Sequence, residues 1–469
     1  MTDLNVSKYL HYVEVDTDIY IGWNRFFPSI FILNKAAIGL LDRIDQQTPF
    51  ESNDNIAYFI NESKKHKFLY EGDTDPSEKD FLALIDQKLK ELDRNAREFY
   101  DTEADYNELK FMTNVCNLGC SYCVNKHAAS LGGGQFHPHE RMRAVEMCID
   151  QFFERKVKRG VREAKVFFNG GEMLADWPLM EKIVNRISTR YSQFNVEYSI
   201  NTNMTLLTEE IARFFNRHHF KVHLSIDGYR DAHDKSRVYH NGKGSFDDVI
   251  RNVELYRMHN PNTPPVIFQG TIKSLEDFKP EDVYRMDRYG FAAARLAPNL
   301  LEVSEEDARE KAKLMGWFLE SNTPEGFRVE ESIFTTAKNK INQDAYRFAF
   351  NCPGLSGFPR LGIEFNLTEL SVSHLCGYIK KAAMPFKDLN ENIYDPALWD
   401  HSSRYIRERM DTLRRECMEC RLVGICAGGC ILSGIDQWNR LNKAACVYQN
   451  DIWEIYLKKV YRDRKKKKA

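Results

Sequence analysis

The feature that most constrains the fold is a series of strand-like segments that alternates with amphipathic helical segments between residues 107 and 298. The strand candidates are short apolar runs bounded by polar residues or glycine: ELKFMTNV, AKVFFNG, VEYSINTN, KVHLSID, VIFQGTI and AAARLAP. Helical periodicity lies between them, as in ERMRAVEMCIDQFFERK and TEEIARFFNRHH. Six strands alternating with helices predict a parallel sheet, either open or curled into a partial barrel.

The rest of the chain divides into further units. YLHYVEV, DIYIGWN and SIFIL predict three short strands, and with the helical KAAIGLLDRI, NIAYFINESK and SEKDFLALIDQKLKEL they indicate a separate α+β unit over 1–100. We assign the barrel to 105–305 and a helical bridge to 306–350. A cysteine-rich, loop-rich domain follows over 351–450, and a terminal helix with a basic tail over 451–469.

Polar or thiol side chains follow four consecutive strand candidates of the predicted sheet. Because ligands collect at the carboxyl ends of parallel strands, we expect these residues to share one rim. A single polar residue there could be a helix cap, and for Asp227 that alternative is about as strong. Four strands with such ends indicate a binding site, whose candidate residues are Cys116, Cys120, Cys123, Gly170, Gly171, Glu172, Asn203, Ser225 and Asp227.

The three cysteines of CNLGCSYC are one short of the four that most metal sites use. A zinc ribbon pairs its ligands as C-x2-C with a second pair elsewhere, and a disulfide framework needs an even count in a small secreted chain. Three cysteines in one loop can instead bind three irons of a cubane and leave the fourth iron for another ligand.

These motifs resemble those of the radical S-adenosylmethionine (radical SAM) superfamily. CNLGCSYC matches its CxxxCxxC signature, FNGGE its methionine-binding segment, and SINTN, LSIDG and HDKSR the strand-end segments of one large subgroup. The resemblance implies a partial (β/α)6 TIM-type barrel and a catalytic [4Fe–4S] cluster on Cys116, Cys120 and Cys123, with S-adenosylmethionine on the open iron. Cleavage of the sulfonium would then give a 5′-deoxyadenosyl radical that abstracts a substrate hydrogen. Met204 departs from the family, since many relatives have glycine there.

The same resemblance implies contacts to the cosubstrate. Gly170, Gly171 and Glu172 would hold its amino group, and Ser225 and Arg237 its ribose or carboxylate. Tyr122, Asn203 and Asp227 would complete the binding site.

A second group of cysteines lies near the C-terminus. Cys417, Cys420, Cys426 and Cys430 form C-x2-C-x5-C-x3-C, Cys446 follows, and Cys352 and Cys376 lie upstream. Seven thiols can ligate one four-coordinate site and three positions of another, and zinc remains an alternative. With a radical SAM barrel attached, the pattern resembles a SPASM domain. That resemblance implies two auxiliary [4Fe–4S] clusters, three in all: a distal one on Cys417, Cys420, Cys426 and Cys446, and a nearer one on Cys352, Cys376 and Cys430.

Two features are not assigned by these cluster ligands: the eleventh cysteine, and the fourth ligand of the nearer cluster. Cys148 lies on the apolar stripe of its helix, which predicts a core thiol. The fourth iron of the nearer cluster is either ligated by a non-cysteine group or open to a substrate thiolate, and the second case would suit thioether formation.

Many SPASM enzymes modify peptides, and the first hundred residues look like a winged-helix, PqqD-like recognition element. This resemblance implies a ribosomal precursor peptide whose leader extends the edge of the N-terminal sheet. An electron donor such as flavodoxin or ferredoxin would supply the cluster. We therefore expect a peptide maturase that forms an intramolecular crosslink.

Two alternatives remain. One is an anaerobic sulfatase-maturing enzyme, whose family typically has aspartate directly after a SPASM cysteine; here Gly377 follows Cys376, and Ser371 replaces a usual glycine. The other is a non-catalytic iron–sulfur electron carrier, which leaves GGE unexplained. The net charge of −2 gives no reason to expect a nucleic-acid or membrane partner, and without an apolar span or a secretory signal we expect a cytoplasmic enzyme. In that compartment eleven cysteines are more often ligands than disulfides.

Overall fold

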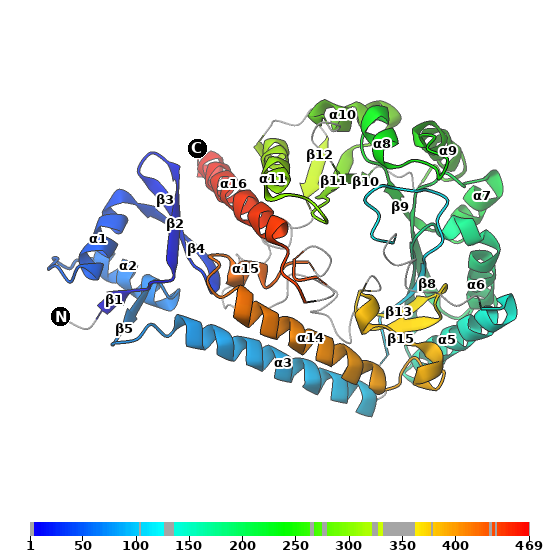
Figure 1. Cartoon of the computed structure of the whole chain (residues 1–469), viewed down its shortest axis with the longest axis horizontal. Coiled ribbons are helices and arrows are strands. Elements are labelled where there is room, and N and C mark those ends of the chain that lie inside the picture. Colours follow the sequence, from blue (N-terminus) through cyan, green and yellow to red (C-terminus); the bar gives the residue numbers. More distant parts are fainter. Residues whose placement is uncertain are drawn as a thin grey trace.

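The computed structural model describes residues 4–102, 105–125, 136–262, 267–273, 279–320, 327–331, 362–376, 379–430, 434–436 and 439–468. Within this part, a small N-terminal unit connects through two long helices to a large α/β unit (Figure 1). Among the described residues, every helix is too short or too polar to cross a bilayer. Cys352 lies outside the described residues, so the prediction that it ligates a cluster has no structural counterpart here.

One ten-stranded sheet forms the centre of the α/β unit, in the order β12-β11-β10-β9-β8-β7-β6-β13-β14-β15. The six predicted strands are confirmed as β6 (Glu108–Thr113), β7 (Glu163–Gly170), β8 (Asn195–Thr202), β9 (Lys221–Ser225), β10 (Ile267–Ile272) and β11 (Ala293–Pro298). All of them pair in parallel, as the alternating pattern predicts. The result is an α/β fold with a large, mostly parallel sheet.

The sheet continues beyond these six strands at both edges. β12 (Arg328–Glu331) adds a parallel strand beside β11, within the segment predicted to be a helical bridge. At the other edge β13 (Ile363–Asn366) pairs in parallel with β6, and β14 (Ser371–Ser373) and β15 (Met384–Pro385) continue antiparallel. The cysteine-rich domain therefore shares its sheet with the barrel, which the strand and helix pattern did not indicate.

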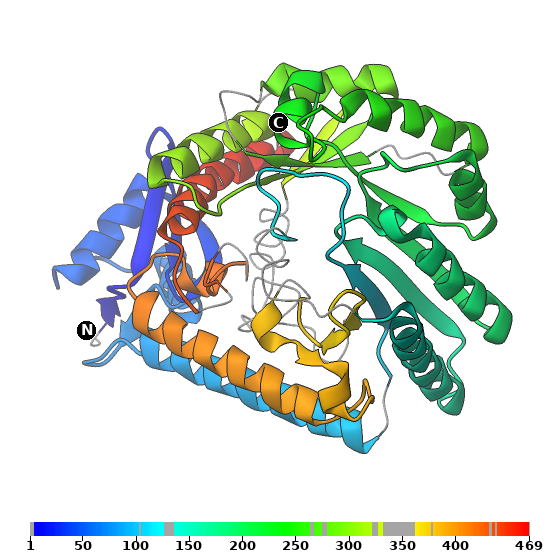
Figure 2. The same ribbon diagram turned by 45° about the vertical axis from the view of Figure 1, so that its right-hand side comes forward.

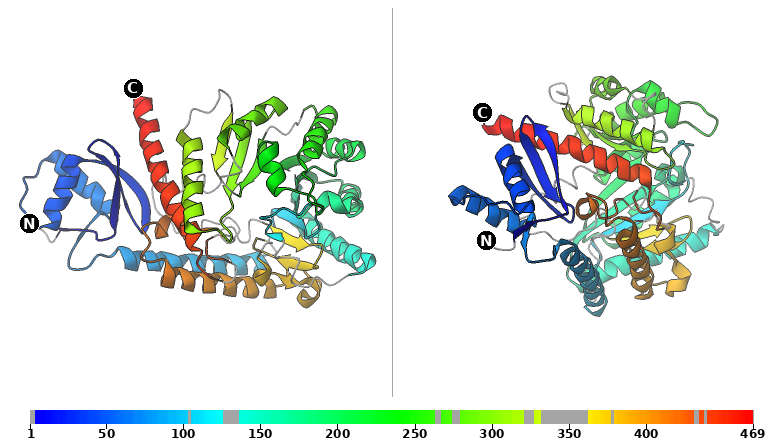
Figure 3. Two further views of the ribbon diagram at one scale, coloured as in Figure 1. Left: turned by 45° about the horizontal axis from the view of Figure 1, so that its top comes forward. Right: turned by 60° about the vertical axis from the view of Figure 1, so that its left-hand side comes forward.

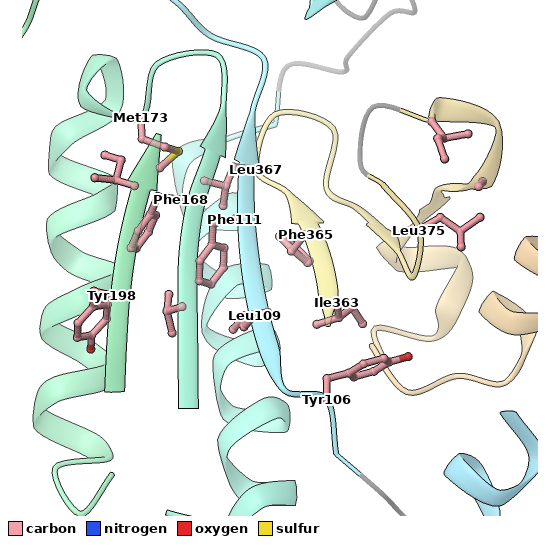
Figure 4. Close-up of a cluster of buried hydrophobic side chains, with 14 of the residues drawn as sticks. Tyr106, Leu109, Phe111, Phe168, Met173, Tyr198, Ile363, Phe365, Leu367 and Leu375 are labelled. Carbon is pink, nitrogen blue, oxygen red and sulfur yellow. The ribbon is translucent and has the colours of Figure 1, made fainter. Parts of the chain in front are cut away.

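Helices cover the outer, convex side of this curved sheet (Figures 1 and 2). They are α5 (Pro138–Lys158), α6 (Trp177–Arg190), α7 (Glu209–Arg217), α8 (Arg230–Ser236), α9 (Phe246–His259), α10 (Pro280–Tyr284) and α11 (Glu305–Glu320). Alternate side chains of each strand face these helices, so Phe111 of β6, Phe168 of β7 and Tyr198 of β8 lie in one buried layer, which Ile363 and Phe365 of β13 extend (Figure 4). Cys148 of α5 is fully buried in this core, which confirms its prediction as a core thiol.

The N-terminal unit contains the three predicted strands and helices. β2 (Leu10–Asp16), β3 (Ile19–Asn24) and β4 (Phe27–Asn34) form an antiparallel sheet, and α1 (Lys35–Asp45) and α2 (Asp54–Lys65) accompany it. A separate pair, β1 (Leu4–Val6) with β5 (Leu69–Glu71), was not predicted. Asn34 and Asn53 cap α1 and α2 by accepting hydrogen bonds from Ala37 N and Ile56 N, which fixes where both helices begin.

Two long helices connect the N-terminal unit to the rest of the molecule. α3 (Ser77–Asp101) lies alongside α14 (Ala397–Glu416), as Figures 1 and 2 agree. The ion pairs Asp93–Arg407 and Asp86–Arg414 join their exposed sides. α16 (Lys443–Lys468) packs against α11 and crosses one face of the N-terminal sheet (Figure 3).

Candidate functional site

The carboxyl ends of the barrel strands surround a cavity of about 410 Å³. The predicted residues that line it are Cys116, Cys120, Tyr122, Cys123, Gly170, Gly171, Asn203, Ser225 and Arg237. Thr271, Asn299, Leu301 and Cys430 also line it, and the strand pattern had not singled out the first three of these. The structure therefore brings together residues from six strand ends, β6 to β11, and one cysteine of the C-terminal group.

The cysteine loop after β6 is held by backbone hydrogen bonds. Gly119 N donates to Val238 O (2.7 Å), and Ser121 N donates to Ser236 O (3.1 Å). His240 Nε2 lies 3.1 Å from the carbonyl of Cys116, and Leu118 N donates to Cys116 Sγ (3.4 Å). These contacts fix the three thiols at the cavity wall, and the segment 236–240 that provides most of them lies far away in sequence.

Two glycines allow β7 to end directly against the chain that leads into the cysteine loop. Gly170 has φ +106°, and a Cβ there would lie 2.3 Å from Thr113 O. A Cβ on Gly171 would lie 2.1 Å from Val115 O. Any side chain at either position would displace the cysteine loop, so the two glycines are required by backbone packing as well as by the ligand approach that their pattern indicates.

Glu172 lies behind the cavity wall and is fully buried. Its carboxylate accepts hydrogen bonds from Leu174 N (3.0 Å), Asn203 N (2.7 Å) and Thr202 Oγ1 (3.0 Å). Burial raises the pKa of Glu172 to about 7, against the opposing effect of these hydrogen bonds. Glu172 thus joins the ends of β7 and β8; its predicted contact with an amino group stays a prediction.

Asn203 connects the end of β8 to the cysteine loop. Its Nδ2 lies 3.9 Å from Cys116 Sγ and 3.1 Å from Asn117 Oδ1. Its Oδ1 accepts hydrogen bonds from the backbone and hydroxyl of Thr205. The amide therefore faces the thiol with a donor, and this arrangement would stabilise a thiolate at Cys116.

Arg237 provides the positive charge at the cavity wall. Its Nε lies 3.0 Å from Asp227 Oδ1, and its guanidinium lies 5.6 Å from the centre of the Tyr122 ring. Asp227 is buried behind the wall and also accepts hydrogen bonds from Tyr122 and from Thr271 N (2.8 Å). Burial raises the pKa of Tyr122 well above its ordinary value, so the phenol stays a donor. Asp227 thus positions Arg237 and Tyr122.

A buried histidine and serine support this arrangement from the second layer. His233 Nδ1 accepts from Asp227 N (3.3 Å), and its Nε2 lies 2.9 Å from Ser245 Oγ. Ser245 donates to the carbonyl of Arg237 (2.7 Å). Of these residues, Asp227 and Arg237 were predicted from the sequence, whereas His233 and Ser245 had not been singled out.

The C-terminal cysteines line a second cavity of about 210 Å³. Five of the predicted ligands meet there: Cys417, Cys420, Cys426, Cys430 and Cys446. Cys430 lines both this cavity and the first one. Burial raises the pKa of Cys417 to about 12 and that of Cys446 still further, so binding of a metal group would have to release protons.

Cys376 follows β14 and packs, half-buried, against the large core. It is not among the described residues that line either cavity. In the described part of the chain, no three His, Cys, Asp or Glu side chains are close enough to hold one metal ion. A tetrahedral zinc would need its sulfurs ~3.8 Å apart, given Zn–S bonds of about 2.3 Å, whereas a cubane separates its thiolates further because each binds a different iron.

The segment that provides most of the first cavity's residues is similar in sequence to known proteins. Residues 111–279 match the Radical SAM superfamily. A cysteine-type anaerobic sulfatase-maturating enzyme of Clostridium novyi is 31% identical over 153 residues, which are 31% of this chain and 39% of that protein. The radical SAM cyclopropyl synthase TigE of Paramaledivibacter caminithermalis is 23% identical over 277 residues, 55% of each chain.

Among solved structures, native anSMEcpe with bound AdoMet shares the fold with a TM-score of 0.56, at 20% identity over 76% of this chain and 97% of that one. The chain spans about half or less of the length of the first curated relatives that it matches. Residues 111–279 thus match the radical SAM superfamily model, and the similar proteins include enzymes of that superfamily.

Proposed function

We propose that the chain is a radical SAM enzyme that modifies a peptide substrate and carries three [4Fe–4S] clusters, one catalytic and two auxiliary in a SPASM domain. The observation that carries this proposal is the position of Cys430, which lines both cavities. A group bound by the C-terminal cysteines would therefore lie next to the space where substrate must meet the cosubstrate.

The first cavity fits its cofactors by the chemistry of its walls. Cys116, Cys120 and Cys123 would hold the catalytic cluster, and Arg237 would bind the carboxylate or ribose of S-adenosylmethionine. Together these cofactors supply a 5′-deoxyadenosyl radical that abstracts a hydrogen atom. The residues of the chain orient and shield: Asp227 fixes Arg237, Asn203 donates toward Cys116, and Glu172 holds two strand ends together.

In the proposed reaction the substrate is the leader-bearing precursor of a ribosomal peptide, and the product contains an intramolecular crosslink. The N-terminal sheet supports a leader-binding role, because β2 and β4 have no strand partner at their outer edges among the described residues. Tyr12 of β2 is 49% exposed and Ile32 of β4 is 42% exposed. These two side chains mark the two edges to which a peptide could add.

Sulfatase maturation is the second candidate and is equally compatible with the comparisons. The relatives include sulfatase-maturating enzymes of Clostridium novyi and of Bacteroides thetaiotaomicron. The shared chemistry of both candidates is hydrogen abstraction from a side chain of a peptide. The two differ in product: a crosslink joins two residues, whereas maturation converts a Cys or Ser into an aldehyde.

Anaerobic incubation of the reconstituted enzyme with S-adenosylmethionine, a reductant and candidate peptides tests the proposal. We expect 5′-deoxyadenosine, together with a peptide that has lost a hydrogen pair and contains a crosslink in tandem mass spectra. An aldehyde that reacts with a hydrazide would establish the maturation candidate instead. If no 5′-deoxyadenosine forms, either with any of the peptides or in the absence of peptide, both candidate functions are contradicted.

A further inference from the structure

Arg409 of α14 is a fully buried cation without an acidic partner among the described residues. Its Nη1 donates to Ile435 O, and its Nη2 donates to Gly428 O (2.8 Å) and Gly429 O (3.0 Å). Its Nε is buried without a hydrogen-bond partner. Arg407 and Arg414 of the same helix instead pair with Asp93 and Asp86 at the surface.

Moving a guanidinium from water into the protein interior is unfavourable, and a negative charge nearby offsets part of that cost. Three carbonyl oxygens solvate part of this charge, but they are neutral and leave its long-range field uncompensated. A structure that keeps such a residue in its interior therefore requires negative charge nearby. The chain's described carboxylates do not supply it to Arg409.

The second cavity is where this negative charge would be. Gly428 and Gly429, whose carbonyls bind Arg409, line that cavity together with Cys417 and Cys426. Burial raises the pKa of the Cys417 thiol, and the charge of Arg409 acts against that rise by favouring the thiolate. Glu416, a carboxylate that also lines the cavity, is exposed and pairs with Arg415 (3.1 Å).

The loop between Cys426 and Cys430 is shaped so that its carbonyls reach Arg409. Ala427, Gly428 and Gly429 are all in the left-handed region, with φ of 48°, 82° and 69°. Gly434 packs onto this turn so closely that a Cβ there would lie 2.1 Å from Gly428 O. Ala427 is strained there, because left-handed backbone is unfavourable for an L-residue, whereas the two glycines adopt it readily. Arg409 therefore stabilises a turn that places two cysteines.

We propose that Arg409 is the buried counter-cation of the second cysteine site, where its fixed charge offsets that of an anionic iron–sulfur cluster held by the thiols. This inference rests on the proposed function. A cluster bound by thiolates is negatively charged, and reduction adds a further electron. A fixed cation nearby stabilises the reduced state more than the oxidised one, so Arg409 raises the midpoint potential of that cluster. Arg409 is thus a positioning and charge-tuning residue.

Two variants separate its charge from its hydrogen bonds. Arg409→Gln keeps N–H donors for the carbonyls but removes the charge, whereas Arg409→Lys keeps the charge but loses the fork of donors. Arg407→Met is the matched control, because it removes a cation from the same helix at an exposed position. All are made in the full chain with Cys116, Cys120 and Cys123 replaced by alanine, so that only C-terminal clusters remain. The readouts are iron per chain and the midpoint potential from an EPR-monitored titration.

The parent chain with the alanine substitutions tests the proposed function by itself: about 8 irons are expected, and none would reject auxiliary clusters. For Arg409→Gln we expect retained iron and a midpoint shifted to more negative potential, with Arg409→Lys and Arg407→Met close to the parent. A parental midpoint in Arg409→Gln would overturn the inference. So would loss of iron in both Arg409 variants, because that result would assign Arg409 to loop folding alone.

Discussion

At the scale of single residues, the candidate site depends on buried charges that have specific partners. Asp227 is the clearest case, because it binds Arg237, Tyr122 and Thr271 at once from behind the cavity wall. Asp227→Asn keeps the size of the side chain but removes the charge that holds Arg237 in place. We expect S-adenosylmethionine to bind about tenfold more weakly, which corresponds to ~1.4 kcal/mol. Equilibrium dialysis measures this.

The control for that prediction is Asp247→Asn, which removes an exposed carboxylate that pairs with Arg230. It should leave the dissociation constant unchanged, since surface ion pairs contribute little. Unaltered binding in Asp227→Asn would show that Arg237 does not need its carboxylate partner.

Glu172 predicts a pH dependence of stability. Its pKa in the folded chain is about 7, above the ordinary value of 4.5, because burial disfavours the carboxylate. The folded state thus binds the proton more tightly than the unfolded state, so this contribution to stability is greatest below the unfolded pKa. It decreases as the pH rises from about 4.5 to about 7 and is then constant.

Thermal unfolding of the iron-free chain at pH 5 and pH 8 measures this effect against Glu172→Gln. We expect the decrease in melting temperature between the two pH values to be smaller in the variant, because an amide does not titrate. An equal decrease in both proteins would assign the pH dependence to other groups.

At the scale of elements, the N-terminal sheet packs against the C-terminal segment that contains Cys420 and Cys426. Gly424 N donates to Arg25 O (2.9 Å), and Trp23 Nε1 donates to Arg421 O (2.9 Å). Trp23 and Ile21 belong to a buried cluster with residues of this C-terminal segment and of α16. Cys420 and Cys426 pack against the cluster. The N-terminal unit therefore forms part of the wall around the second cysteine site.

Gly424→Ala tests this junction. A Cβ there would lie 2.2 Å from Phe26 O, so the sheet and the loop would have to separate. We expect a destabilisation of about 1–3 kcal/mol, as for other overpacked sites, measured by urea unfolding. Gly39→Ala on α1 is the matched control, because a Cβ there meets nothing within 4 Å and alanine favours a helix. Equal stability of Gly424→Ala and the parent chain would contradict the junction.

The sequence predicted the helices and strands better than it predicted the contacts between them. Strict alternation of strands and helices was enough for β6 to β11, and the asparagines before α1 and α2 agree with their observed starts. β12 and β13 were missed because a strand of four residues has too little periodicity to stand out. The cysteine spacing grouped Cys417, Cys420, Cys426 and Cys446, and the structure adds Cys430 to the same cavity. The spacing contained no signal for Arg409 or Ser245, whose roles depend on contacts between distant segments.

At the scale of the whole molecule, the N-terminal unit is not separable from the barrel. The buried face of α3, which includes Phe81, Ile85, Leu92 and Phe99, belongs to the same core as the barrel strands. We expect removal of residues 1–100 to give an aggregated chain with little iron, because this core would be exposed. Size-exclusion chromatography measures the result, and a monomeric, iron-replete product would contradict the shared core.

Leader binding must therefore be tested with point variants. We expect Tyr12→Lys or Ile32→Lys to weaken binding of a fluorescent leader peptide by at least about tenfold, since only one edge receives the added strand. Fluorescence anisotropy with the full chain provides the measurement. Unchanged affinity in both variants for a peptide that the parent chain binds would place the leader elsewhere.

The central claim is that both cysteine groups bind iron–sulfur clusters around one substrate space. Iron and sulfide per chain after anaerobic reconstitution test it most directly. Three cubanes predict about 12 irons per chain. A value of about 4 would keep the catalytic cluster and contradict the auxiliary ones.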